Sequence, residues 1–286
     1  MSQREISARA GLRAERRYLF DMQQEPKQFA ERAALIAHVK NISPMLAGHM
    51  GAEASPIKGG RAAAEAALAN IDPIAYGHSR NYLDGAVTWL SSYIRHGILS
   101  LNEVRNHALE LGDGKAIEKF IQELGWRDFW QRIYAQNPDW LWRDIEEYKT
   151  GFCADDYADA LPDDIAAGET ESAAMNHFIA ELKNTGYLHN HARMYLAAYM
   201  VHWRRVKWQA GAVFFLEHLL DGDAASNNLS FQWVASTFAN KPYFFNLDNL
   251  QKFAAMHAPC DYRDNKCFAG TYDDVAMRLF PNMEAL

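Results

Sequence analysis

Arg193 belongs to a segment, TGYLHNHARMYLAAYM, whose apolar spacing predicts a helix with one buried face. Asn190 and Met194 fall on the same helical stripe, three positions before it and one after it. A buried guanidinium needs an anionic partner, because an unpaired charge in a protein interior is costly. We predict that Asp221, in the segment LLDGDAASNN, is that partner, and such a pair would be strongly oriented beside a bound ligand.

A second group of residues lies in the segment FIQELGWRDFW. Glu123, Trp126 and Arg127 have helical spacing, so one face would present a carboxylate, a large ring and a cation together, with Phe120 one turn earlier. This arrangement fits a ligand-binding face. An exposed amphipathic helix with a surface ion pair has the same pattern.

Hydroxyl groups gather at the predicted start of a helix in VTWLSSYIRHGILS, where Thr88, Ser91 and Ser92 stand. Hydroxyls and free backbone N–H groups at a helix start can bind phosphate, although a simple N-cap has the same residues. The DGD of residues 221–223 resembles the opening of a calcium loop. That interpretation fails because Ser226 stands where the loop needs glycine and no acid follows at the twelfth position.

The predicted elements that carry these residues are all helical. The chain has 286 residues, a formal net charge of −7, 49% hydrophobic and 23% charged residues, which excludes disordered, collagen-like and coiled-coil proteins. Strand patterns are nearly absent, so we predict an all-α protein with helices near residues 61–70, 87–96, 101–111, 115–136, 172–184, 189–207, 210–220, 230–239 and 246–257. The acidic segment 150–170 is predicted to be a solvated loop.

Two domains are expected: a helical N-terminal extension and linker over residues 1–55, and the main domain over residues 56–286. Within the first, two polar helices are predicted, broken near Pro26, before a loop at 41–60. There is no secretory signal and no apolar run of membrane-spanning length. We therefore expect a cytoplasmic protein with no membrane partner.

Metal binding is not expected. Three cysteines cannot form a disulfide framework or a four-thiolate centre. Cys260 and Cys267, with His257 nearby, have poor ligand spacing, and structural thiols are the favoured interpretation. His189 and His191 are two positions apart, which points their side chains in different directions on a helix.

The order and spacing of these segments is more specific than any one of them. The run of Tyr76-x-x-x-Arg80-Asn81, VTWLSSYIRHGILS, ELGWRDFW, TGYLHNHARM and DGDAASNN-x-x-x-QW closely resembles the flavin-binding domain of the DNA photolyase/cryptochrome family, over about residues 56–253. The resemblance implies an all-helical domain that holds FAD in a U shape. The residues it implies as FAD contacts are Tyr76, Val87, Thr88, Trp89, Leu90, Ser91, Phe120, Arg127, Asn190, Arg193, Asp221, Asp223 and Asn227.

Within that set, the resemblance implies that Arg193 and Asp221 pair near the isoalloxazine. It also implies that Asn227 lies beside flavin N5 and favours the reduced flavin. For cyclobutane-dimer photolyases, the family pattern is electron transfer from light-excited reduced flavin to a flipped-out pyrimidine dimer, whose ring splits before the electron returns.

The positions of dimer recognition are also matched. The residues that the resemblance implies as catalytic are Glu123, Trp126, Asn190, Met194 and Trp233. Glu123 would have to be protonated to donate to a pyrimidine carbonyl, and Trp126 and Trp233 would stack on and wall the lesion. Asn190 is typical of the cyclobutane type, since the (6-4) type has His there.

The resemblance has three departures. An antenna domain has no room before residue 56, so no antenna chromophore is expected. Phe231 stands at the flavin-proximal tryptophan of the electron-transfer chain, although Trp208 matches the middle one; Trp140 or Trp142 could be a distal remnant. Tyr187 replaces the tryptophan of the usual TGW motif.

The predicted function is therefore an antenna-free, FAD-dependent photolyase, an enzyme acting on UV-damaged DNA. The alternative is a cryptochrome-like blue-light receptor without repair activity. The basic residues that could grip DNA phosphates are Arg132, Arg143, Lys149, Lys183, Arg204, Arg205, Lys207 and Lys241, which are equally compatible with a scattered solvated set.

Overall fold

The computed structural model describes residues 28–42 and 54–283, in two compact units, Met1–Ala54 and Ser55–Leu286. In the first unit, helix α2 covers Arg32–Ile42, which is the second of the two helices predicted there. The first predicted helix and the central part of the predicted 41–60 loop lie outside the described residues. Residues 54–60 have no helix, as predicted.

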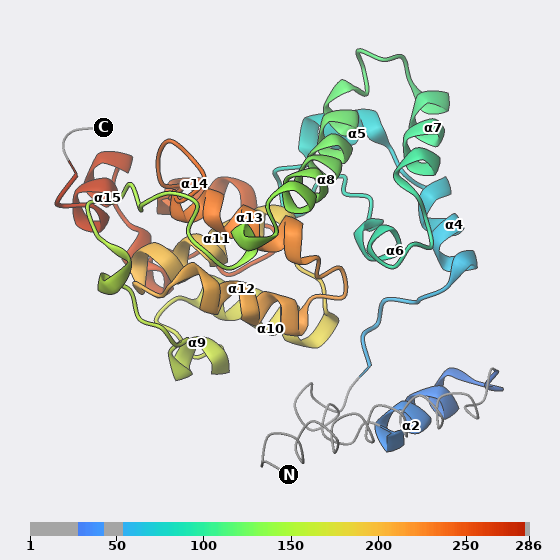
Figure 1. The fold of residues 1–286 in the computed structure, drawn as a ribbon, viewed down its shortest axis with the longest axis horizontal. Helices are drawn as coiled ribbons and strands as arrows, with labels where there is room; N and C mark the ends of the chain where they lie inside the picture. Colours follow the sequence, from blue (N-terminus) through green and yellow to red (C-terminus); the bar gives the residue numbers. More distant parts are fainter. Residues whose placement is uncertain (1–27, 43–53, 284–286) are drawn as a thin grey trace, which may run out of the picture. The chain divides into compact units, whose positions relative to one another are not determined.

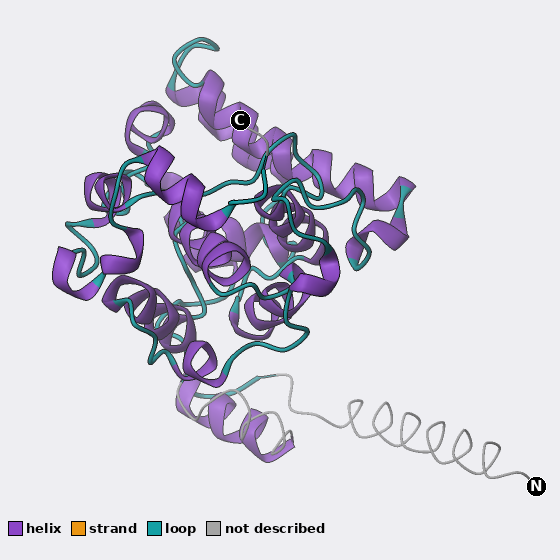
Figure 2. Ribbon diagram, turned by 90° about the vertical axis from the view of Figure 1, so that its left-hand side faces the viewer, coloured by secondary structure: helices purple, strands orange, loops and turns teal. Residues whose placement is uncertain are grey.

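The second unit is entirely helical in the part that the structure describes, which confirms the all-α fold class (Figure 2). One isolated bridge joins Ala158 and Val206. The helices are α4 (Arg61–Ala69), α5 (Pro73–Ser79), α6 (Ser91–Arg95), α7 (Leu101–Leu111), α8 (Glu118–Gln136), α9 (Asp163–Ala167), α10 (Ala173–Thr185), α11 (Asn190–Ala198), a π-helix (Tyr199–Trp203), α12 (Trp208–His218), α13 (Ala224–Ala235), α14 (Leu247–Ala254) and α15 (Tyr272–Leu279). Among described residues, no helix is long and apolar enough to cross a membrane.

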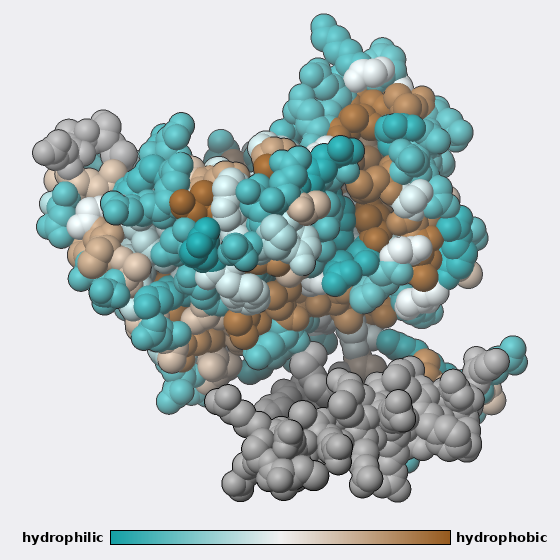
Figure 3. All heavy atoms as spheres, viewed as in Figure 1, coloured by the Kyte–Doolittle hydropathy of each residue, from teal (hydrophilic) through white to brown (hydrophobic). Residues whose placement is uncertain are grey.

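Two main apolar cores lie in this unit. A smaller one joins α4, α6, α7 and α8, labelled in Figure 1, through residues such as Leu90, Val104 and Phe120. The space-filling view shows hydrophobic residues over this part of the molecule (Figure 3). The larger one lies among α10 to α14 around the fully buried Trp208 and Tyr195. Helix α8 packs against α5 and α7 and also against α13, so it connects the two cores.

Capping residues explain where several helices begin. Ser100 and Glu103 form a capping box at α7, and Asp72 accepts from the first turn of α5, whose first residue is Pro73. Asp223 accepts a hydrogen bond from the backbone N–H of Ser226 at the start of α13. Each of these side chains satisfies a backbone donor that the helix itself leaves without a partner.

Three predicted helices differ from the structure. The helix predicted at 87–96 covers only α6, because residues 87–90 are non-helical and Trp89 has φ +58°. The helix predicted at 189–207 consists of α11 followed directly by the π-helix, which ends at Trp203. The helix predicted at 230–239 is wrong in its bounds, since α13 begins directly after the Asp223 cap and ends before Ser236, which has φ +72°.

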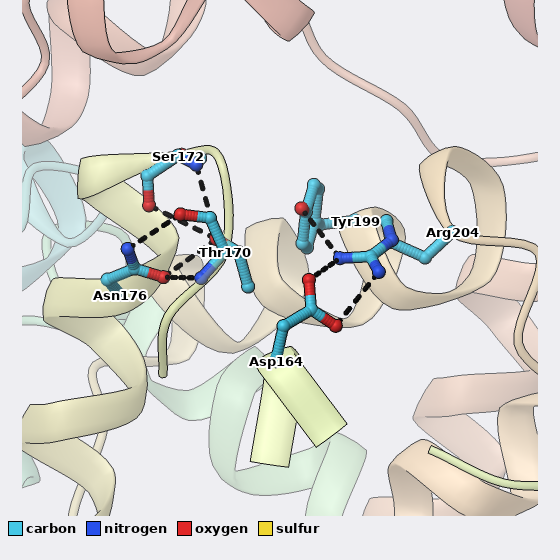
Figure 4. A network of polar contacts seen from close by, with 6 residues as sticks. All are labelled: Asp164, Thr170, Ser172, Asn176, Tyr199 and Arg204. Atoms are coloured by element: carbon cyan, nitrogen blue, oxygen red, sulfur yellow. Dashed lines mark hydrogen bonds and ion pairs between the residues drawn. The ribbon is translucent and has the colours of Figure 1, made fainter. Parts of the chain in front are cut away.

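The acidic segment 150–170 is more ordered than a solvated loop, which corrects that prediction. It contains α9, and Arg204 holds the Asp164 carboxylate with two hydrogen bonds, of 2.7 and 2.9 Å, while also donating to the hydroxyl of Tyr199 (Figure 4). Beside it, the Asn176 Oδ1 atom accepts from the backbone and hydroxyl of Thr170. These contacts fasten the segment to the π-helix and to α10.

Candidate functional site

The predicted ion pair between α11 and the loop before α13 is present. Arg193 Nη2 donates to Asp221 Oδ2 at 2.8 Å, and Arg193 Nε donates to the Leu188 carbonyl at 2.7 Å. The Asp221 side chain is 3% exposed and that of Arg193 is 23% exposed. Burial alone would raise the pKa of Asp221, but the Arg193 charge and hydrogen bond, helped by the nearby Ser91 hydroxyl, outweigh it and hold the pKa below its usual range.

A glycine turn brings the two halves of this pair together. Gly186 ends α10 with φ +71°, and its carbonyl accepts a hydrogen bond from Leu220 N at 2.8 Å. A Cβ atom on Gly186 would lie 2.6 Å from Leu220 Cγ. Only glycine therefore allows the turn before Tyr187 to lie directly against the loop that carries Asp221.

Helices α6 and α8 hold the same loop from two other sides. Arg95 Nε donates to the Gly222 carbonyl at 2.6 Å, and a ring nitrogen of His96 lies 2.8 Å from the Leu220 carbonyl. From α8, Gln131 donates to the Asp223 carboxylate at 2.7 Å. Four segments distant in sequence, α6, α8, the 186–193 region and the 219–223 loop, therefore meet at one place.

This meeting point has an excess of positive charge. Arg127 on α8 is half-buried and makes no ion pair within 4 Å with any described carboxylate, although Asp221 and Asp223 are the nearest acids to it. Burial lowers the pKa of Arg127, and Arg95 and Arg193 contribute in the same direction. Three arginines face two aspartates, so the site is suited to an anionic group.

Two buried polar atoms beside these charges also lack partners. Asp221 Oδ1 and the Ser226 hydroxyl have no hydrogen bond of normal geometry to any described residue. Buried polar atoms without partners are rare in folded proteins and call for a bound group or water. Their position at the arginine cluster indicates a polar ligand there.

Aromatic side chains line the adjoining wall. Trp89 packs on Tyr187 with ring centroids 4.2 Å apart, and the Arg193 guanidinium lies 5.6 Å from the Tyr187 ring centroid. Burial raises the pKa of Tyr187 to about 12. Tyr76 and Phe120 meet edge to face at 5.2 Å. The Trp89 side chain is 51% exposed. Its backbone is left-handed, a strained conformation that is typical of functional sites.

The other residues of the predicted phosphate segment, Val87, Thr88 and Leu90, do not gather at one point. Thr88 Oγ1 accepts a hydrogen bond from Leu90 N at 3.4 Å. The Leu90 side chain packs into the smaller core, and Val87 is partly buried. The helix start falls at Ser91, and α6 has only five residues. A phosphate site at this helix start stays a prediction.

Glu123 is held by two cations. Its carboxylate lies 2.8 Å from Lys119 Nζ and 3.3 Å from Arg80 Nη2, and its side chain is 24% exposed. The sequence predicted a neutral acid in a desolvated pocket. The structure shows Glu123 paired with Lys119 and Arg80, and its contact with a lesion stays a prediction.

The other predicted substrate residues lie on three helices that pack in series, α8 on α13 and α13 on α11. Trp126 is 49% exposed and Trp233 is 40% exposed. Asn190 Nδ2 lies 3.8 Å from Met194 Sδ, so these two side chains touch on the first turn of α11. Trp130, which the sequence analysis missed, stacks on Trp126 at 5.6 Å.

The amide nitrogen of the Asn227 side chain is already hydrogen-bonded within the protein. Its Nδ2 atom donates to the Ala212 carbonyl and to the Asn228 side chain, both at 3.0 Å. The Oδ1 atom has no hydrogen bond to the described residues. Asn227 thus offers an acceptor rather than a donor to any ligand beside it.

Comparison with known proteins gives the family. Residues 120–263, half of the chain, match the model of the FAD binding domain of DNA photolyase. The chain belongs to this family. A deoxyribodipyrimidine photo-lyase of Streptomyces griseus is 33% identical over 207 residues, which cover 70% of this chain and 42% of that protein. The chain spans less than half the length of the relatives it matches.

Solved structures agree with this assignment. The crystal structure of an archaeal photolyase from Sulfolobus tokodaii with two FAD molecules is 26% identical, with a TM-score of 0.60, covering 78% of this chain and 50% of that one. A cryptochrome from Synechocystis sp. PCC6803 has a TM-score of 0.62 at 19% identity, covering 79% and 51%, and supports the fold alone. The family model confirms FAD as the cofactor that the sequence predicted.

Phe231 and Trp208, which the sequence analysis predicted as electron-transfer positions, both lie in the larger core. Phe231 is 3% exposed and packs edge to face on Phe215 at 4.9 Å. A Cβ atom on Gly211 would lie 2.8 Å from the Phe231 ring, so the ring fits tightly. Trp208 is fully buried, and its indole N–H donates to Asp144 at 2.6 Å. Trp142 is 48% exposed.

Most of the basic residues predicted for DNA contact already have partners. Arg132, Lys149, Arg204 and Lys207 form ion pairs with Asp128, Glu146, Asp164 and Asp159. Arg205 lies over the Phe152 ring and donates to the Leu279 carbonyl. Lys183 donates to the Ala166 carbonyl. Whether the eight residues share one face stays a prediction.

Proposed function

We propose that this chain is the FAD-binding and catalytic part of a blue-light-driven deoxyribodipyrimidine photo-lyase that splits cyclobutane pyrimidine dimers. The observation that carries the proposal is the exposure of Trp126 and Trp233 on two helices that pack together, α8 and α13, the second of which also packs on the helix that carries Asn190 and Met194. Unpaired bases stack on exposed aromatic rings of this kind. The photo-lyase relatives support the same activity.

The residues around the arginine cluster fit FAD. The excess positive charge at Arg95, Arg127 and Arg193 suits the diphosphate, and the partnerless polar atoms of Asp221 and Ser226 suit the ribityl hydroxyls. When bound in its reduced form, FAD supplies the electron that opens the cyclobutane ring under light and takes it back afterwards.

The protein's part in the reaction is to position and shield. The Arg193–Asp221 pair fixes one wall of the cofactor site, and its Leu188 hydrogen bond restricts the guanidinium further. The Asn227 oxygen would accept from N5–H of reduced flavin, which favours that redox form. Trp126 and Trp233 would hold the lesion out of the helix and keep water from it.

The charge on Glu123 changes its expected contact with the lesion. If Glu123 keeps its ion pairs with Lys119 and Arg80 when the lesion binds, its carboxylate accepts hydrogen bonds and does not donate to a pyrimidine carbonyl. It would instead accept from a pyrimidine N3–H. Lys119 and Arg80 would then keep Glu123 as their ion-pair partner when the lesion binds.

The supply of electrons to the flavin distinguishes this chain within its family. Phe231 is much harder to oxidise than tryptophan, so light-driven reduction through Trp208 would be slow. Repair does not need that step when cellular reductants keep FAD reduced. A light receptor that signals through flavin photoreduction does need it, and Phe231 therefore favours repair.

The test is repair of a dimer-containing oligonucleotide by protein whose FAD has been chemically reduced. Loss of dimers should require blue light and should fall at least about fivefold in Trp126→Ala and in Trp233→Ala, because stacking on one ring contributes about 1–3 kcal/mol per base. The matched control is Trp142→Ala, which removes an equally exposed ring and should repair normally.

The second candidate is a cryptochrome-like receptor without repair activity. The net charge of −7 and the ion pairing of most candidate DNA-contacting cations favour it. It predicts no dimer loss with reduced flavin and no preference for damaged over undamaged DNA. That pair of results would replace the repair proposal.

A further inference from the structure

A cluster of three potential metal ligands lies outside the arginine site. His177 and Glu181 stand one turn apart on α10, and His257 approaches them from the segment after α14. His257 Nε2 is 2.9 Å from Glu181 Oε2, and the His177 and His257 rings are perpendicular with centroids 5.4 Å apart. The ligand atoms of the three all lie within 4.8 Å of one another.

We propose that His177, Glu181 and His257 form a binding site for a divalent late first-row transition metal, of which zinc is the representative. Two imidazole nitrogens and one carboxylate oxygen are the donors of three-ligand zinc sites that keep a fourth position for water. Calcium and magnesium are excluded by the same donors, because both prefer oxygen-only ligands.

The side chains are free to bind. His177 has ring contacts but no hydrogen bond to any described residue, and the only ion-pair partner of Glu181 in the described structure is His257 itself. The Glu181 carboxylate is 16% exposed and His257 is 32% exposed, so solvent and a metal ion can reach them. Within residues 28–42 and 54–283, no lysine or arginine forms a salt bridge with this carboxylate.

The backbone around the cluster is fixed in advance. His257 N donates to the Ala254 carbonyl at 2.8 Å, and Gln251 donates to the Cys260 carbonyl at 2.9 Å, which holds the turn after α14. Ligands in a tetrahedral site stand about 3.3 Å apart for metal–nitrogen distances near 2.0 Å. Rotations of the three side chains that move their ligand atoms by about 1 Å would therefore bring these atoms to the spacing of a bound metal, with no change in α10.

The chain also contains a matched pair without a third ligand. His107 and Glu110 stand three positions apart on α7 with 3.6 Å between Nδ1 and Oε2, and among the described residues only the α10 group brings three such ligands together. His107→Ala therefore removes a helical His–Glu pair of the same chemistry while leaving the proposed site intact.

The experiment uses the full-length FAD-loaded chain without an affinity tag, freed of metal by a chelator, and zinc as the probe. Competition against a chromophoric chelator should give one zinc per chain. His177→Ala and His257→Ala should each weaken binding at least about tenfold, since even indirect support of a ligand is worth 10–100-fold. His107→Ala should bind as the wild type does.

Two readouts separate binding from folding. X-ray absorption at the zinc edge should show two imidazole nitrogens in the wild type and one in each histidine variant. The flavin absorption and far-UV circular dichroism of the variants should match the wild type. Equal zinc affinity in wild type and His177→Ala, or an equal loss in His107→Ala, would overturn the proposal and leave a hydrogen-bonded His257–Glu181 pair only.

Discussion

Replacing Arg193 by methionine tests whether the Arg193–Asp221 pair organises the cofactor site. Methionine keeps most of the apolar length of arginine but removes the charge and the bonds to Asp221 and Leu188. The change leaves an aspartate that is 3% exposed without its main counter-charge. Breaking a buried pair in this way costs about 3–5 kcal/mol of unfolding free energy.

Replacing the other partner of the pair, Asp221, should cost less unfolding free energy. Asp221→Asn keeps a hydrogen-bond acceptor for Arg193, which is 23% exposed and retains its bond to Leu188. Exchanging a charged for a neutral acceptor costs about 1–2 kcal/mol. The predicted asymmetry, Arg193→Met worse than Asp221→Asn by about 2 kcal/mol, follows from which partner is more deeply buried.

The two proteins should also differ in their response to pH. In the wild type the pKa of Asp221 is lowered, so its contribution is present at neutral pH and is lost as the pH falls through the folded-state pKa. In Arg193→Met, burial dominates and raises that pKa, so protonation relieves the buried charge. The stability gap between the two proteins should therefore narrow as the pH falls from 7 toward 4.

The assay is urea unfolding followed by far-UV circular dichroism, on protein stripped of FAD and again with saturating FAD. Arg132→Met is the control, because its pair with Asp128 is exposed and should contribute only about 0.3–0.5 kcal/mol. Equal losses in Arg193→Met and Arg132→Met, or a larger loss in Asp221→Asn than in Arg193→Met, would refute the reasoning.

Three further predictions follow from single contacts. Gly186→Ala should cost at least about 2 kcal/mol of unfolding free energy, about 1 more than Gly97→Ala, because both have positive φ but only Gly186 meets Leu220; equal losses by urea unfolding would contradict this. Phe231→Trp should speed flavin photoreduction with an external donor, measured as bleaching of oxidised flavin; an unchanged rate would place the break elsewhere. Glu123→Ala should weaken binding of dimer-containing DNA about 5- to 10-fold, which is one hydrogen bond, while Glu123→Gln should bind normally; equal weakening in a fluorescence anisotropy titration would argue against an accepting role.

The long helices were predictable because their apolar spacing is regular. The helices predicted at 101–111, 115–136, 172–184, 210–220 and 246–257 are present with end shifts of no more than three residues. Helices α5 and α15 were missed because they are short. Their caps were readable, since Asp72–Pro73 and the Thr271 capping box are helix-start signals.

The errors lie where local geometry outweighs periodicity. The left-handed backbone of Trp89 interrupts the helix predicted at 87–96, and the π-helix after α11 has no spacing signal. The Asp223 cap fixed the start of α13 six residues before the predicted one. Asp223 is a strong N-cap residue, so the start of α13 is readable in the sequence.

The ion pair of the site was predictable from the sequence, but not all of the residues that surround its other members were. The Arg193–Asp221 pair followed from the cost of a buried charge. Of the cations around Glu123, Lys119 stands one helical turn earlier and was readable from the spacing. Arg80 was not, because it comes from a segment 43 residues earlier and reaches Glu123 only through the packing of α5 on α8. Likewise, His257 meets His177 only once α14 and α10 are folded.

The most direct measurement of the central claim is the fluorescence lifetime of reduced FAD in this chain, with and without dimer-containing DNA. If excited flavin passes an electron to a lesion held between Trp126 and Trp233, saturating damaged DNA should shorten the lifetime, and undamaged DNA should not. The shortening should disappear in Trp126→Ala. A lifetime that stays constant while damaged DNA is fully bound would contradict the account.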